Sequence, residues 1–156
     1  MIKIMNIKSI ICLVIFSLCS NQAWAADWVY YMKSTFGDEY YDKSNIKKVN
    51  ENIIRVWTKT IFNKDGKKKW FSLLKSINEA PDKPDILNYE LMLNEIDCIN
   101  ERGRFTSMTI NYDEKAIVYW GMKSPSKWMK IEPLSTIGIL QNKVCSAGKN
   151  SQTKKK

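Results

Sequence analysis

The sequence has 156 residues, of which 44% are hydrophobic and 12% aromatic, and its formal net charge is +9. It contains no histidine, so the commonest general base and the commonest metal ligand are absent. The four cysteines have no CxxC spacing, which argues against a closed zinc site or a thioredoxin-type redox site. We therefore expect a non-enzymatic protein with no cofactor and no metal site.

The N-terminal residues have the pattern of an export signal. Lys3 and Lys8 form a basic region, residues 10–18 form a short apolar core, and Ala23-Trp24-Ala25 ends in a small-x-small pattern. The apolar run is about half of the roughly 20 residues that a membrane-spanning helix needs. We expect a signal peptide over residues 1–25 and a mature protein in the periplasm or at the outer cell surface.

The cysteines divide between this segment and the mature chain. Cys12 and Cys19 lie in the segment, and Cys98 and Cys145 remain after cleavage. Two cysteines in an oxidising compartment most often form one disulfide, with an intermolecular bond as the alternative. Lipidation at Cys19 is an alternative to simple cleavage, but Leu18 stands where lipoprotein signals usually carry a small residue.

The first half of the mature chain predicts short strands separated by turns. Residues 27–32 and 39–42 are extended, and 52–62 form the clearest strand because β-branched and aromatic residues dominate it. One face of this strand carries Ile54, Val56, Thr58, Thr60 and Phe62, and the other carries Arg55, Trp57, Lys59 and Ile61. Residues 63–66, Asn-Lys-Asp-Gly, predict a turn in which glycine supplies the positive φ.

A basic cluster surrounds this predicted turn and is our candidate binding site. It consists of Lys64, Lys67, Lys68 and Lys69, followed directly by Trp70. Basic residues beside aromatic rings suit polyanionic glycans, lipid head groups or acidic protein surfaces. We expect no nucleic acid partner, since an exported chain rarely meets one, but peripheral membrane contact is compatible with the cluster. The alternative is a solvated hairpin tip, because charge runs at turns usually serve solubility.

The second half predicts strands followed by a helix. Residues 67–85 fit a short helix or an irregular strand lying over the sheet, and 86–97 fit a helix or a strand. Residues 104–112 and 116–121 predict a hairpin. Ile137, Leu140 and Val144 recur at spacings of three and four, which predicts a helix over 136–144 with these residues on one face. Ser135 is a good N-cap for this helix, although Gly138 costs about 1 kcal/mol relative to alanine. Residues 146–156 are polar and lysine-containing, so we expect a disordered tail.

Paired carboxylates are the feature of the sequence that would favour an enzymatic function. Glu95 and Asp97 would share one face of a strand, and a second acidic group lies near a turn, at Asp38, Glu39 and Asp42. Paired carboxylates can act as general acid and base. Because Arg102 and Arg104 follow closely and lysines are frequent, we interpret these groups as ion-paired or solvated.

The order and spacing of several motifs resemble the surface-adhesin protein E family. The motifs, which together span nearly the whole expected domain, are Trp28, Tyr41-Asp42-x-Ser44-x-Ile46, Val56-Trp57-x-Lys59, Glu95-Ile96-Asp97-Cys98, Arg104, Trp128-x-x-Ile131-x-Pro133-x-Ser135 and Val144-Cys145. The resemblance implies an α+β domain over residues 26–145, with a curved antiparallel β-sheet and a C-terminal helix packed on it. It also implies a strand over 89–97 and one intradomain disulfide between Cys98 and Cys145.

The sequence departs from the family pattern at three places. Leu134 stands where the family commonly has glycine, Gly138 interrupts the helix, and residues 67–85 are longer than the usual connection. The resemblance implies an exported, non-enzymatic binding protein with a macromolecular partner, for which host matrix proteins and anionic glycans are the candidates. The alternative is a periplasmic housekeeping or inhibitor module with no role in adhesion.

Overall fold

The structure, a computed structural model, describes residues 25–112, 116–120 and 125–150. Apart from Ala25, the expected export segment lies outside these residues, as do the expected turn at 113–115 and residues 151–156. Within the described part, no helix is long and apolar enough to cross a membrane.

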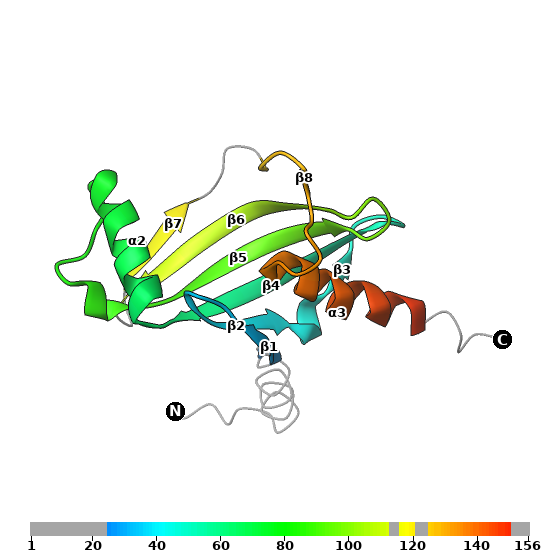
Figure 1. Cartoon of the computed structure of the whole chain (residues 1–156), viewed down its shortest axis with the longest axis horizontal. Coiled ribbons are helices and arrows are strands. Elements are labelled where there is room, and N and C mark those ends of the chain that lie inside the picture. The colour runs from blue at the N-terminus through cyan, green and yellow to red at the C-terminus, as the bar shows by residue number, and fades with distance from the viewer. Residues whose placement is uncertain (1–24, 113–115, 121–124, 151–156) are drawn as a thin grey trace, which may run out of the picture.

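The described strands form one antiparallel sheet in the order β1-β2-β4-β5-β6-β7, with β3 pairing with β4 and β8 with β6 (Figure 1). Their bounds are β1 Trp28–Lys33, β2 Gly37–Asp42, β3 Lys47–Lys48, β4 Ile53–Phe62, β5 Leu87–Asp97, β6 Arg102–Tyr112, β7 Ala116–Trp120 and β8 Met129–Lys130. The helices are α2 Lys64–Ser76 and α3 Thr136–Asn150, with 3-10 turns η1 Lys43–Asn45 and η2 Pro84–Ile86. The α+β class with a C-terminal helix is confirmed.

The ambiguous segment before Cys98 is a strand. Residues 87–97 pair with β4 on one side and with β6 on the other, which agrees with the family resemblance rather than with the helical alternative. The expected hairpin is also present, because β6 pairs with β7 from Met108↔Trp120 to Tyr112↔Ala116. Register shifts in the β1–β2 and β5–β6 pairs interrupt the ladders, and such bulges bend and twist the strands that carry them.

Alternation along β4 gives the sheet a covered face and an outer face. Val56 and Phe62 are buried on the covered face, whereas Ile61 on the outer face is 42% exposed. Val56 belongs to the hydrophobic cluster under α3, and Phe62 to the cluster under α2. Residues an even number of positions apart on a strand point to the same side, so both helices pack on one face (Figure 1).

The C-terminal helix packs through the stripe predicted from its sequence and runs further than predicted. Leu140 and Val144 are 1% exposed and pack on Val56 and Ile96 of the sheet. At the N-terminus, Ser135 Oγ accepts a hydrogen bond of 3.2 Å from the Gly138 amide, which confirms the N-cap. The helix continues to Asn150. Cys145 therefore lies inside the helix rather than past its end, and residues 146–150 are helical where we expected disorder.

Gly138 is required by packing rather than tolerated as a weak helix former. A Cβ built on Gly138 would collide with the carbonyl oxygen of Glu132 and lie 2.7 Å from that of Pro133. Helix propensity alone predicts that Gly138→Ala stabilises by about 1 kcal/mol. We expect instead a loss of about 1–3 kcal/mol in the free energy of unfolding, because overpacking displaces backbone. Chemical denaturation measures the sign, and a more stable variant would contradict the close contact.

The prediction of a turn at residues 63–66 is wrong. Asn63 is the N-cap of α2, and its side chain accepts a hydrogen bond of 2.9 Å from the Gly66 amide. None of the described glycines has a positive φ. A Cβ on Gly66 would collide with the Phe36 carbonyl oxygen, so glycine is needed here for close approach. Asn-x-x-Gly therefore starts a helix, and α2 is the element that covers this end of the sheet.

Candidate binding surface

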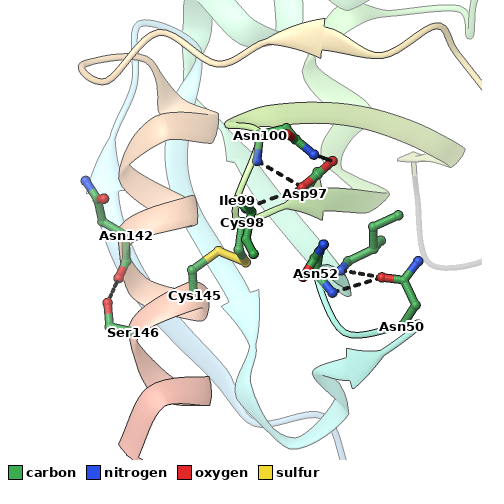
Figure 2. The surroundings of a disulfide bond; sticks show 10 residues. Asn50, Asn52, Asp97, Cys98, Ile99, Asn100, Asn142, Cys145 and Ser146 are labelled. Carbon is green, nitrogen blue, oxygen red and sulfur yellow. Dashed lines mark hydrogen bonds between the residues drawn. A yellow bond between two sulfur atoms is a disulfide. The ribbon is translucent and has the colours of Figure 1, made fainter.

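The disulfide joins the end of β5 to α3 within one domain, as expected. Cys98 and Cys145 have a Cα–Cα distance of 5.7 Å and are 47 residues apart in sequence. Figure 2 shows the bond between the helix and the turn that follows the strand. The Cys98 amide also donates to the Asn52 carbonyl oxygen at 2.9 Å. The bond therefore fixes α3 to the sheet at the end remote from α2.

Asp97, the residue before this disulfide, holds the turn together. Its carboxylate accepts hydrogen bonds from the Ile99 amide and from the amide and side chain of Asn100 (Figure 2), and from Arg102. Burial alone would raise the pKa of Asp97, but these hydrogen bonds outweigh burial and lower its pKa to about 2. Asp97 is thus ionised and fully engaged, which fits a structural role.

This pKa predicts a loss of stability in acid. Because the pKa of folded Asp97 lies below its ordinary value, its stabilisation is present above about pH 4 and disappears as the pH falls towards 2. Asp97→Asn should lower the free energy of unfolding by about 2 kcal/mol at neutral pH and by much less near pH 2. Denaturation across this range measures the difference, with Asp82→Asn, an exposed carboxylate, as the matched control. A constant difference at every pH would contradict the assignment.

Glu95 forms the centre of an ion-pair network on the outer face. It is 2% exposed, and its carboxylate oxygens lie 2.5 Å from Arg55 and 2.7 Å from Arg104. Burial opposes ionisation, but the two arginines prevail and lower the pKa of Glu95. The Arg104 guanidinium also lies 4.4 Å from the centre of the Trp128 ring. Ion pairing and a lowered pKa therefore describe Glu95 and Asp97, the first pair that we considered for acid–base chemistry.

The lysines of the predicted binding site lie on α2 and do not form one patch with Trp70. Trp70 is 8% exposed and packs in the cluster under α2. Lys67 Nζ donates to the Asp85 carbonyl oxygen at 2.5 Å, and Lys69 Nζ lies 3.7 Å from the centre of the Phe36 ring. Lys64 and Lys68 are exposed. Lys69 Nζ also lies 5.8 Å from the Trp70 ring centre, but the ring itself is buried and does not have the exposure that contact with a partner requires.

A second surface, which we did not identify from the sequence, lies on the outer face of the sheet. Strand register places Tyr30 beside Tyr40, Tyr40 beside Lys59, and Ile61 beside Tyr89. The Lys59 ammonium lies 4.4 Å from the Tyr89 ring centre and 5.6 Å from that of Trp28. We call the following residues the aromatic band: Trp28, Tyr30, Tyr40, Trp57, Lys59 and Tyr89.

The aromatic band is open to solvent on the side away from the helices. Tyr30 is 52% exposed, and the other members are partly exposed. Neither α2 nor α3 packs on this side of the sheet (Figure 1). Tyrosine and tryptophan present large, rigid surfaces with a polar end, which is why they are enriched where proteins bind one another. The band is therefore the best candidate for a binding surface among the described residues.

The sequence contained part of the signal for this band. Alternation in 52–62 placed Trp57 and Lys59 together on the second face of one strand. The remaining rings come from β1, β2 and β5, and only the pairing of these strands brings them beside β4.

Fold and surface together define a small α+β domain with a disulfide and with an aromatic sheet face that neither α2 nor α3 covers. The profile of the family described as Surface-adhesin protein E matches residues 28–146, and the chain belongs to this family. Membership indicates a surface or exported protein that binds macromolecules. No curated protein and no solved structure matches the chain.

Proposed function

We propose that this protein is an exported, non-enzymatic adhesin that binds a partner protein through the aromatic band. The single observation that carries the proposal is that, within the described part of the chain, the face of the sheet opposite α2 and α3 has no helix packed on it and bears clustered rings. Exposed rings that pack edge-on, as Tyr30 and Tyr40 do with centroids 5.6 Å apart, are already ordered. Ordered side chains lose little conformational entropy when a partner binds.

Charge on the same face favours an acidic partner. Arg55 and Arg104 share one buried carboxylate, and their side chains are 42% and 27% exposed. Lys59 adds a further positive charge. A patch with excess positive charge accelerates association with acidic surfaces and makes binding weaker at high salt. Among the candidate partners, we therefore favour host matrix proteins with acidic segments over neutral surfaces.

The proposal is tested by binding of the oxidised, exported protein to immobilised matrix proteins, a heparin-like glycan and lipopolysaccharide across salt concentrations. The expected result is saturable binding to at least one matrix protein, with affinity that falls as salt increases. Binding to the glycan alone would indicate a different class of partner. Absence of binding to every matrix protein would overturn the proposal.

The alternative is a periplasmic housekeeping or inhibitor module. Protease treatment of intact cells separates it from an adhesin, because a surface adhesin is cleaved without opening the outer membrane. Complete protection until the outer membrane is opened would exclude direct adhesion to a host and leave the aromatic band as a surface for a periplasmic partner.

A further inference from the structure

A cavity of about 240 Å³ lies on the covered face of the sheet. The buried side of β4 reads Val56, Thr58, Thr60, Phe62, so two threonines separate the residue under α3 from the residue under α2. Both threonines line the cavity, and Ile137 and Leu140 of α3 line it from above. The cavity therefore has a polar floor on the sheet and an apolar wall on the helix.

A buried glutamate, Glu39, and a half-buried one, Glu90, meet on this floor. Glu39, Thr60 and Glu90 are neighbours in one row across β2, β4 and β5, and all three line the cavity. Glu39 is 7% exposed, and Oε2 of Glu90 is buried without a hydrogen-bond partner among the described residues. Within that part of the chain neither carboxyl group forms an ion pair. Buried carboxylates are normally paired with a cation, so this pair is an exception.

The two contacts of Thr60 favour a state in which one of the two carboxyl groups carries a proton. Thr60 Oγ1 lies 2.8 Å from Glu39 Oε2 and 2.9 Å from Glu90 Oε1. A hydroxyl group carries one proton and can donate to only one of these oxygens. The other contact is a hydrogen bond only if that carboxyl group is protonated and donates to Thr60. One proton shared between the two carboxyl groups would make both contacts hydrogen bonds.

The surrounding charges agree with this state. Burial, together with the negative charge of Glu39, raises the pKa of Glu90 to about 7. The hydrogen bond from Thr60 and the positive charge of Lys69 on α2 lower this pKa but do not cancel the increase. Burial also raises the pKa of Glu39, with a contribution from Asp38. Tyr31 of β1 has a raised pKa, caused first by burial and then by both glutamates, so it faces the pair as a neutral phenol.

We propose that this cavity binds a primary ammonium group on a short apolar stem, carried either by a small alkylamine or by a lysine side chain of a partner. An ammonium group donates three hydrogen bonds and would form the direct ion pair that neither Glu39 nor Glu90 makes among the described residues. Its stem would lie against Ile137 and Leu140. The volume equals about eight water molecules at roughly 30 Å³ each, which suits a group of lysine size. The site does not depend on the aromatic band.

The test is a titration of the exported, oxidised protein with pentylammonium chloride, followed by NMR. The expected result is saturable shifts at cavity residues such as Thr60 and Ile137 at millimolar concentration, with pentanol, the neutral analogue, at least 10-fold weaker. Nα-acetyl-lysine amide distinguishes the sources: binding indicates a lysine side chain, and its failure beside bound pentylammonium indicates a free amine. No saturable pentylammonium binding, or equal binding of pentanol, would overturn the proposal.

Variants and pH give an independent readout. Glu39→Gln and Glu90→Gln should each weaken pentylammonium binding at least 10-fold, whereas Glu51→Gln, at an exposed position, should leave it unchanged. Binding should release a proton, because the ammonium group favours ionised Glu90. The affinity should therefore rise from about pH 6 to about pH 8, and calorimetry in two buffers of different ionisation enthalpy counts the released proton. Full affinity in both glutamine variants, or no proton release below pH 7, would exclude the assignment.

Discussion

Replacing both Cys98 and Cys145 with alanine is expected to lower the free energy of unfolding by about 4 kcal/mol. The bond closes a loop of 47 residues, and the chain-entropy estimate for loops of 15 to 100 residues is about 3–5 kcal/mol. The loss acts through the unfolded chain, which gains freedom when the loop opens. It also releases α3, whose residues Leu140 and Val144 form part of the core over Val56.

Chemical denaturation with and without reductant measures this effect. Reduction should destabilise the natural protein by about the same amount as the double substitution, whereas the double variant should not respond to reductant. Non-reducing electrophoresis should show a monomer with no free thiol at Cys98 or Cys145. A reductant-independent stability of the natural protein would contradict the role of the bond.

Trp70→Ala is expected to cost about 3–5 kcal/mol of stability, the usual range for removing a buried large aromatic side chain. Trp70 packs against Phe62, with ring centroids 6.3 Å apart, and shares its cluster with Leu74 and Leu87. The substitution leaves a cavity where α2 meets the sheet. The effect is on folding, which differs from the binding role that the neighbouring lysines suggested for this residue.

Trp57→Ala on the aromatic band is the matched control for Trp70→Ala. Trp57 is partly exposed on the outer face, so its loss should cost clearly less stability than the loss of Trp70. Thermal denaturation of the two variants compares them directly. Equal destabilisation would show that Trp57 is as deeply packed as Trp70 and is not a surface residue.

Strands and helices could be predicted where the pattern of apolar residues within one segment was sufficient to assign it. Alternation in 52–62 identified both faces of β4, and the apolar spacing of Ile137, Leu140 and Val144 identified the buried side of α3. The strand over 87–97 could not be assigned from its own pattern, because apolar residues recur there at both helical and strand spacing. The family resemblance supplied that assignment.

The prediction of a turn at Asn63 was wrong for a physical reason. Asparagine followed by glycine three residues later serves equally as a turn and as a helix N-cap. The choice depends on whether the following residues can bury a face, and here Trp70 and Leu74 pack on Phe62 and Ile110. The sequence analysis offered a short helix over 67–85 as one of two alternatives, but the lysines at 64 and 67–69 suggested a solvated turn at its start.

Both proposed sites depend on strand pairing that local patterns do not contain. Glu39 and Glu90 are far apart in sequence, and each meets Thr60 only through the pairing of its strand with β4. We expected Glu39 to be solvated or ion-paired; it is buried and has no ion pair among the described residues. The rings of the aromatic band come together in the same way. Register, rather than composition, creates these surfaces.

We propose that the aromatic band, and not the lysines of α2, binds the macromolecular partner. The most direct measurement compares the affinities of two double variants for the same matrix protein: Trp57→Ala with Lys59→Ala, and Lys64→Ala with Lys68→Ala. We expect the affinity to fall at least 10-fold for the first pair, because central aromatic contacts are removed, and less than 3-fold for the second pair. A large loss for the α2 pair with unchanged affinity for the band pair would contradict this proposal.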